Sequence, residues 1–200
     1  MKKISIGVLV SGSGSNLQAI LDAVGSGALP DAEVAAVISN KPEAFALNRA
    51  LKAGVPGLFL DPKDFPDRLS YYERVIRELE ERGVGLICLA GFLLKLEPNI
   101  VRRFKDHILN IHPALLPKFG GKGMYGHFVH EAVIKAGEKE SGCTVHWVDD
   151  EFDHGAILLQ RKVSVLPGDT PETLAARVLE QEHIAFPEAL RQVVRKIPSP

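Results

Sequence analysis

Short apolar runs alternate with amphipathic stretches through the first 112 residues of the chain. The apolar runs are rich in Val, Ile and Leu and are bounded by turn-forming residues, which is typical of buried strands. Between them, apolar residues recur every three or four positions, as on a helix with one buried face. This pattern predicts strands over residues 4–10, 33–38, 55–60, 85–91 and 108–112. The predicted helices cover residues 16–25, 42–54, 66–82 and 97–104.

This alternation of strands and helices predicts an α/β fold. Strands joined through a helix run in the same direction with right-handed crossovers, so the expected fold is a doubly wound, mostly parallel sheet with helices on both faces. Ligands in such sheets bind beyond the carboxyl ends of the strands. The loops that follow the strands are therefore the place to look for a site.

The pattern changes after residue 118. Residues 119–126, FGGKGMYG, hold four glycines and predict a mobile loop, and a helix is expected over 127–137. Residues 143–148 and 156–165 alternate like the strands of a hairpin. They add a C-terminal antiparallel strand pair to the predicted sheet.

A last helix is predicted to begin after Thr170, a favourable N-cap followed by Pro171 in the first turn, and to end at Pro187. The chain has no internal repeats, low-complexity tracts or linkers. A single domain over residues 1–200 is therefore expected.

Composition narrows the class of protein. The 200 residues are 46% hydrophobic, with 24 basic and 25 acidic residues spread along the chain. No polybasic run indicates nucleic acid, and no apolar stretch approaches the roughly 18 residues of a membrane span. The apolar run at residues 4–10 ends in a glycine loop, so it indicates a buried strand rather than a secretory signal. Cys88 and Cys143 are too few for a disulfide framework, and reduced thiols in a cytoplasmic protein are expected.

A polar pair ends the strand over residues 108–112. Asn110 and His112 are two residues apart, so their side chains project from the same side of the strand. Pro113 stops the strand because it has no N–H for the ladder. An amide that donates to an oxyanion beside an imidazole that carries a proton is the minimum needed for acyl transfer. The alternative is a strand end with a capping Asn and a partly buried His.

The segment SGSGSN at residues 11–16 follows the first strand and precedes a helix. Free N–H groups and the helix dipole at such a position attract a phosphate. The segment is a poor dinucleotide motif, because the third glycine of G-x-G-x-x-G would fall at Leu17, and it lacks the ending of a P-loop. It suits one phosphate monoester held largely by backbone, and the alternative is a tight turn that needs glycine.

The connection between the two hairpin strands is acidic and includes Asp149, Asp150, Glu151 and Asp153. A carboxylate from this turn could favour the imidazolium of His112 and raise its pKa. Residue chemistry alone does not choose among the four acids, and an acidic surface turn is the alternative.

Other histidines carry weaker signals. His146 could be a core histidine or a partner of the polar pair. His127 and His130 are three residues apart on a helix, but no third ligand is spaced to match, so no metal site is predicted. His107 and His183 have no local context that indicates more than a surface or core role.

The glycine loop, the segment LNIHPALLP and the acidic turn occur in order, and the chain resembles the phosphoribosylglycinamide formyltransferases from about residue 4 to residue 190. These are folate-dependent enzymes of purine synthesis. The resemblance implies transfer of a formyl group from 10-formyltetrahydrofolate to the amine of 5-phosphoribosylglycinamide. It further implies the formyltransferase fold, small-molecule substrates, no nucleic acid, membrane or metal, and a monomer or homodimer.

The resemblance also assigns roles to residues. Asn110, His112 and Asp153 would be the catalytic group, which selects one acid among the four. Asn110 and protonated His112 would stabilise a tetrahedral oxyanion, while Asp153 keeps His112 charged and oriented. The implied ribotide-binding residues are Gly14, Ser15, Asn16 and Glu182. The implied folate-binding residues are Arg68, Leu93, Leu94, Lys95, Leu96 and Asn110.

One departure from the family pattern is Gly120, where members often carry proline, so the loop there is expected to be looser. LNIHPALLP alone would also fit a transfer-RNA formyltransferase or a formyltetrahydrofolate hydrolase. Those relatives carry an added C-terminal or N-terminal domain, and the chain extends only about ten residues beyond the shared core. A non-catalytic folate or nucleotide binder on the same sheet is a further alternative.

Overall fold

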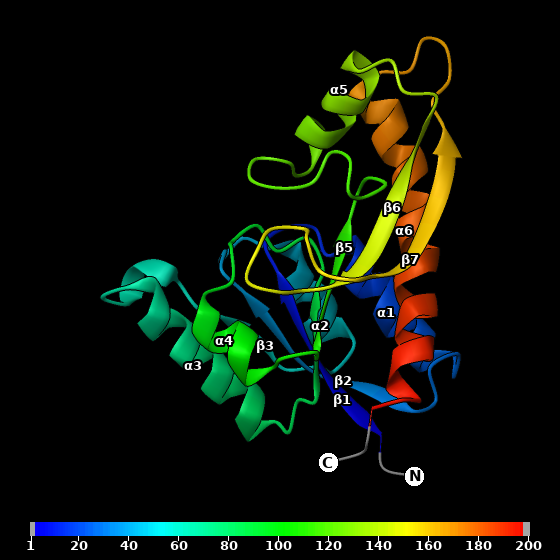
Figure 1. Ribbon diagram of the computed structural model, residues 1–200. Coiled ribbons are helices and arrows are strands. Elements are labelled where there is room, and N and C mark those ends of the chain that lie inside the picture. The colour runs from blue at the N-terminus through cyan, green and yellow to red at the C-terminus, as the bar shows by residue number, and fades with distance from the viewer. Residues whose placement is uncertain (1–2, 198–200) are drawn as a thin grey trace.

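Seven strands form one sheet in the computed structural model of the chain, which describes residues 3–197 (Figure 1). The strand order is β3-β2-β1-β4-β5-β6-β7. The first five strands run parallel, and β6 and β7 are added antiparallel at one edge. The strands are β1 Ile4–Val10, β2 Ala32–Ser39, β3 Gly57–Phe59, β4 Leu86–Leu89, β5 Ile108–His112, β6 Glu140–Trp147 and β7 Ile157–Ser164. This arrangement confirms the predicted fold class.

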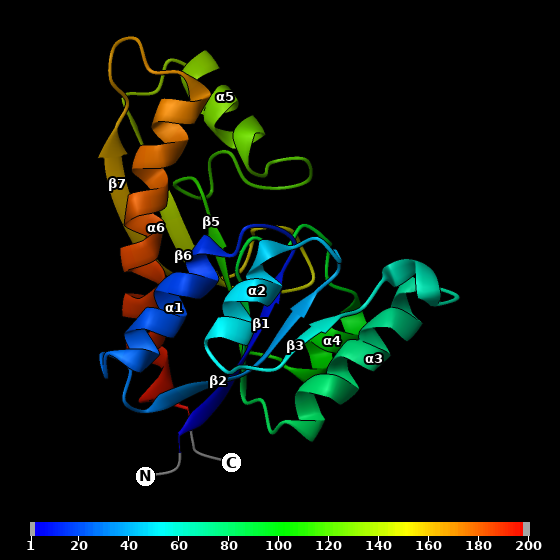
Figure 2. The same cartoon turned by 180° about the vertical axis from the view of Figure 1, so that it is seen from behind.

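Helices cover both faces of the sheet, and the alternation of side chains along the strands divides the core accordingly. Along β1, Ile6 and Val8 pack in the cluster that includes residues of α1, α2 and α6, whereas Leu9 packs in the cluster that includes α3 and α4. The helices are α1 Ser15–Gly25, α2 Phe45–Lys52, α3 Arg68–Glu81, α4 Pro98–Arg103, α5 His127–Lys135 and α6 Pro171–Val194. Figure 2 shows α1 and α6 side by side on one face, with α5 beyond the carboxyl end of β5.

The end predicted for the last helix is wrong, because α6 continues through Pro187 to Val194. A proline inside a helix removes one hydrogen bond and costs about 3 kcal/mol. The residues around and beyond it are buried, and Phe186, Leu190 and Val193 are each at most 3% exposed. Burying each such side chain contributes about 1.5–3 kcal/mol, so packing outweighs the local cost.

Other boundaries shift by a few residues. The third strand is shorter than predicted, α2 begins three residues after Pro42, and α3 begins at Arg68 after Asp67, which accepts a hydrogen bond from the N–H of Ser70 as its N-cap. A short 3-10 helix, η1 Pro62–Asp64, precedes it. None of the helices within residues 3–197 has the length and apolar content to cross a membrane.

Candidate active site

A cavity of about 590 Å³ lies at the carboxyl ends of β1, β4 and β5. Its walls come from the loops after these strands, the 121–127 segment, the connection between β6 and β7, and the first half of α6. Most of the residues named from the sequence line this cavity: Asn16, Leu93, Leu94, Lys95, Leu96, Asn110, His112, Asp153 and Glu182. The predicted ribotide, folate and catalytic groups therefore share one space.

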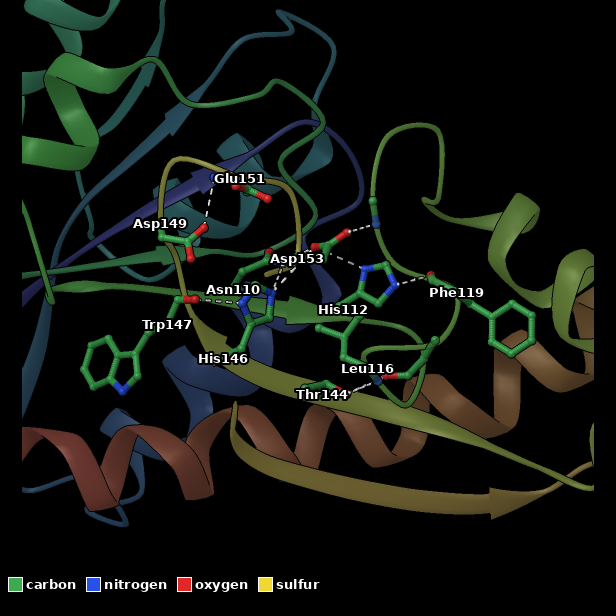
Figure 3. A network of polar contacts seen from close by, with 12 residues as sticks. Asn110, His112, Leu116, Phe119, Thr144, His146, Trp147, Asp149, Glu151 and Asp153 are labelled. Carbon is green, nitrogen blue, oxygen red and sulfur yellow. Dashed lines mark hydrogen bonds and ion pairs between the residues drawn. The ribbon is translucent and has the colours of Figure 1, made fainter. Parts of the chain in front are cut away.

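The amide, the imidazole and the carboxylate of the predicted catalytic group meet at one oxygen atom (Figure 3). Oδ1 of Asp153 lies 3.4 Å from Nδ2 of Asn110 and 3.5 Å from Nδ1 of His112. Oδ2 of Asp153 accepts a hydrogen bond of 2.9 Å from the N–H of Gly121. The carboxylate of Asp153 thus contacts two residues of β5 that lie more than 40 positions earlier in the sequence.

The geometry of β5 explains why the side chains of Asn110 and His112 lie close together. Asn110 and His112 project from the same face of β5, as predicted from their spacing. The loop that follows is fixed by Thr144, whose hydroxyl donates to the carbonyl of Ala114 at 2.6 Å and accepts from the N–H of Leu116 at 3.1 Å. These two buried hydrogen bonds hold the loop in place beside the end of β5.

The connection between β6 and β7 presents only one of its four acids to His112. Asp153 has a φ of 52°, a left-handed conformation that is uncommon for a residue with a Cβ and is found at functional sites. Asp149 instead accepts from Nδ1 of His154 at 2.9 Å and from the N–H of Glu151. The geometry therefore selects Asp153, the acid that the family resemblance implies.

The sequence led us to expect a raised pKa for His112, and this expectation is wrong. Burial lowers the pKa of His112 below its ordinary value, and the opposing effect of the Asp153 carboxylate does not offset it. Nε2 of His112 donates to the carbonyl of Phe119 at 2.8 Å. Burial acts to raise the pKa of Asp153, but contacts with His146, His112 and the N–H of Gly121 bring it below its ordinary value. A neutral imidazole beside an ionised carboxylate is the resting state at neutral pH.

His146 is the site residue whose role the sequence left open. It is 2% exposed and lies opposite Asn110 in the β5–β6 register. Its Nδ1 donates to the carbonyl of Trp147 at 2.8 Å, so Nε2 is free to accept from Nδ2 of Asn110 at 3.0 Å. The ring thereby orients the Asn110 amide. The signal that could have found it is strand pairing, because directly opposite residues on one face interact.

The start of α1 forms one end of the cavity. Its N-cap, Gly14, has a φ of 69° and no side chain caps the helix, so the first N–H groups are available to an anion. Ser13 and Asn16 line the cavity, whereas Gly14 and Ser15, both predicted from the sequence, are not among its lining residues. Nδ2 of Asn16 donates to Oε2 of Glu182 at 2.6 Å. Burial raises the pKa of Glu182, and the hydrogen bond from Asn16 acts in the opposite direction.

We expect Gly14→Ala to damage this end of the cavity. A Cβ at this position would lie 2.6 Å from the Cβ of Ala46, in a left-handed conformation that costs a residue with a Cβ about 1–2 kcal/mol. The free energy of unfolding should fall by at least about this amount, and binding of inorganic phosphate at the start of α1 should weaken. Chemical denaturation and calorimetry with inorganic phosphate test both. Gly12→Ala is the matched control, because a Cβ at Gly12 meets no atom within 4 Å, and equal losses in the two variants would contradict this role of Gly14.

The loop after β4 forms another wall of the cavity. Ser11 ties it to the first strand, since its hydroxyl accepts from the N–H of Leu93 at 2.9 Å and donates to Oδ1 of Asn40 at 2.6 Å. Arg68 is not part of the cavity lining. It contacts the back of the same loop, donating to the carbonyl of Lys95 and pairing with Glu97 at 2.9 Å. Arg68 thus supports this loop from outside the cavity.

Within residues 3–197, no three His, Cys, Asp or Glu side chains are grouped closely enough to hold a metal ion. Cys88 and Cys143 are buried free thiols. The side chains that line the cavity include amides, imidazoles, carboxylates, hydroxyls and the ammonium group of Lys95.

Comparison with known proteins identifies the family. The formyl transferase family model matches residues 4–190. The chain is 44% identical to the phosphoribosylglycinamide formyltransferase of Haemophilus influenzae over 96% of this chain and 86% of that protein. It is 48% identical to the trifunctional purine biosynthetic protein adenosine-3 of Drosophila pseudoobscura pseudoobscura, over 92% of this chain but 13% of that protein.

The similarity to solved structures agrees with the sequence comparisons. The crystal structure of glycinamide ribonucleotide transformylase 1 from Symbiobacterium toebii matches with a TM-score of 0.92 and 43% identity, covering 97% of this chain and 89% of that chain. The chain spans only 13% to 18% of the length of the trifunctional proteins that it matches. The resemblance found in the sequence is confirmed, and the chain belongs to the formyl transferase family.

Proposed function

We propose that this protein transfers the formyl group of 10-formyltetrahydrofolate to the amine of 5-phosphoribosylglycinamide. The observation that carries the proposal is the contact of Asn110 and His112 with one oxygen of Asp153, inside a cavity with an uncapped helix start at one end. Relatives with closely similar chains are named for this reaction. Gly14, Ser15 and Asn16 would hold the phosphate, and Glu182 would face the glycinamide end. The backbone and apolar surface of residues 93–96 would hold the folate.

The reaction needs one bond to form and one to break. The amine nitrogen attacks the formyl carbon, and the carbonyl electron pair moves to oxygen to give a tetrahedral oxyanion. The amine loses a proton, the bond from carbon to N10 of the folate breaks, and N10 takes up a proton. Donors placed beside the oxygen lower the barrier because they are already oriented when negative charge develops.

The surroundings of His112 suit it to gain a proton during the reaction. Both ring nitrogens face acceptors, the Asp153 carboxylate at Nδ1 and the Phe119 carbonyl at Nε2. Only the doubly protonated ring satisfies both, although burial keeps the ring neutral at rest. An oxyanion that replaced the Phe119 carbonyl at Nε2 would add negative charge and favour the imidazolium. In this proposal Nδ1, the ring nitrogen without a proton at rest, accepts the amine proton by way of the Asp153 carboxylate as the amine attacks, and gives it back by the same route as the folate leaves.

Asp153→Asn tests the carboxylate. Asp153 acts to raise the pKa of His112, so its loss should lower that pKa further. Since the free enzyme needs neutral His112, activity falls at acid pH as this ring protonates, and the acid limb of kcat/KM should move to lower pH in the variant. At neutral pH the rate should fall roughly tenfold to a hundredfold, because the imidazolium that forms loses its carboxylate. Circular dichroism serves as the folding control, and an unchanged pH profile would remove Asp153 from this role.

The assignment itself is tested by turnover. Purified protein given the ribotide and 10-formyltetrahydrofolate should release tetrahydrofolate with no added metal or nucleotide, and formylated ribotide should appear in equal amount. Dependence on ATP and formate would point to a different enzyme. Release of free formate without the ribotide would favour a hydrolase, and ligand binding with no turnover would favour a non-catalytic binder.

A further inference from the structure

His130 is a buried residue of the cavity wall that the chemistry above does not use. It lies in α5 and is only 4% exposed. Its Nδ1 is fully buried and has no hydrogen-bond partner among residues 3–197. An unpaired buried nitrogen is unfavourable, and an aromatic hydrocarbon ring would fill the same space without that cost. Any benefit of an imidazole here must therefore come from its other nitrogen.

That other nitrogen, Nε2, is not among the fully buried atoms without a partner, and no hydrogen bond joins it to the described residues. It is the polar atom that the ring offers to the cavity. Burial lowers the pKa of His130 to about 4, with His127 and His112 acting in the same direction. The ring is neutral at neutral pH, and its proton is better placed on Nε2 than on the enclosed Nδ1. His130 can thus donate to an acceptor in the cavity.

The surroundings favour an anion as that acceptor. The start of α5 has no side-chain cap, and Gly126 and His127 of this turn line the same cavity as the uncapped start of α1. Two helix N-termini, each with free N–H groups and a positive dipole end, therefore border one space.

The start of α1, where the phosphate of the proposed substrate would bind, has few other hydrogen-bond donors beside it. Lys95, in the loop after β4, is the one lysine or arginine among the described lining residues. From α6 the cavity is lined by apolar side chains and two acids, and Oε2 of one of these acids, Glu182, accepts from Asn16 at the start of α1. The α6 lining residues are Pro171, Glu172, Ala175, Ala176, Leu179 and Glu182, and carboxylates accept hydrogen bonds but do not donate them. A phosphate dianion at the start of α1 would need hydrogen bonds that α6 does not supply.

We propose that His130 and the start of α5 form the second half of the phosphate site, with Nε2 of His130 donating to the ribotide phosphate held at the start of α1. This inference rests on the proposed function in assuming a phosphorylated substrate. His127, one turn earlier, is not the donor in this proposal. It is 54% exposed at the side chain and its Nδ1 lies 3.4 Å from Oε1 of Glu172.

His130→Phe is the direct test. The variant should fold at least as well as the parent, because it removes an unpaired buried nitrogen. Loss of a hydrogen bond to a charged group should raise the ribotide KM and the dissociation constant of inorganic phosphate roughly tenfold to a hundredfold. The folate KM should stay within twofold. His130→Gln, whose amide nitrogen can take the place of Nε2, should recover part of the affinity.

His183→Phe is the matched control. His183 also has a buried nitrogen without a partner among the described residues, but it does not line the cavity, so its replacement should leave both affinities unchanged. The inference is overturned if His130→Phe binds inorganic phosphate as tightly as the parent, or if only the folate KM moves. Calorimetry with inorganic phosphate needs no turnover. Weakened phosphate binding in the variant of a protein that shows no formyl transfer would keep this inference and reject the proposed function.

Discussion

His112→Ala should lose roughly a thousandfold in kcat, the largest effect expected of any single substitution in this protein. His112 is placed to donate to the oxyanion and to carry the amine proton, and alanine does neither. The KM values for ribotide and folate should change little, because the proposed contacts of this ring strengthen only as charge develops. Single-turnover kinetics with both substrates saturating measures the chemical step directly.

The control for this variant must address folding, because His112 is 3% exposed and its removal leaves a small void. Thermal unfolding and ribotide binding by calorimetry should be close to those of the parent. A folded, substrate-binding His112→Ala protein with a rate within tenfold of the parent would show that the ring is a structural residue only.

Asn110→Ala should lose roughly a hundredfold to a thousandfold in kcat, the effect of removing one oxyanion donor. In the free protein the amide of Asn110 is held by Nε2 of His146 at 3.0 Å and by Oδ1 of Asp153 at 3.4 Å. This hydrogen-bonded amide is oriented before the substrate arrives. The same kinetics on the variant measures the loss, which should appear in kcat and not in KM.

His146 provides the comparison for Asn110. It touches the amide and not the substrate in this account, so His146→Gln should cost less than Asn110→Ala, about tenfold. A His146 variant that is as damaged as Asn110→Ala while still folded would mean that the ring itself meets the substrate.

The sequence predicted the sheet well because its signals are local. Apolar runs bounded by turn residues gave five parallel strands, and period-two alternation gave the antiparallel pair. The error at Pro187 has a different origin. A proline is a local stop signal, but burial of Phe186 and Leu190 against the sheet and α1 is a tertiary effect, and it extends α6 by seven residues beyond Pro187.

The site was only partly predictable, because some of its contacts depend on tertiary structure rather than on local sequence. Asn110 and His112 share a face by strand geometry alone, whereas the choice of Asp153 depends on how a loop folds back over β5. The role of His146 required the register between β5 and β6. The lowered pKa of His112 required its burial, which charge patterning along the chain does not reveal. The unpaired nitrogen of His130 likewise becomes visible only in three dimensions.

In the proposed mechanism, Asn110 and His112 act on the same oxygen atom of the reacting formyl group. The most direct measurement is the single-turnover rate of the double variant Asn110→Ala/His112→Ala beside the two single variants. Groups that act as a unit give strongly non-additive losses. We expect the double variant to be about as slow as His112→Ala alone. A double variant whose rate loss is the full product of the two single losses would mean that the two side chains act independently, and would contradict the account.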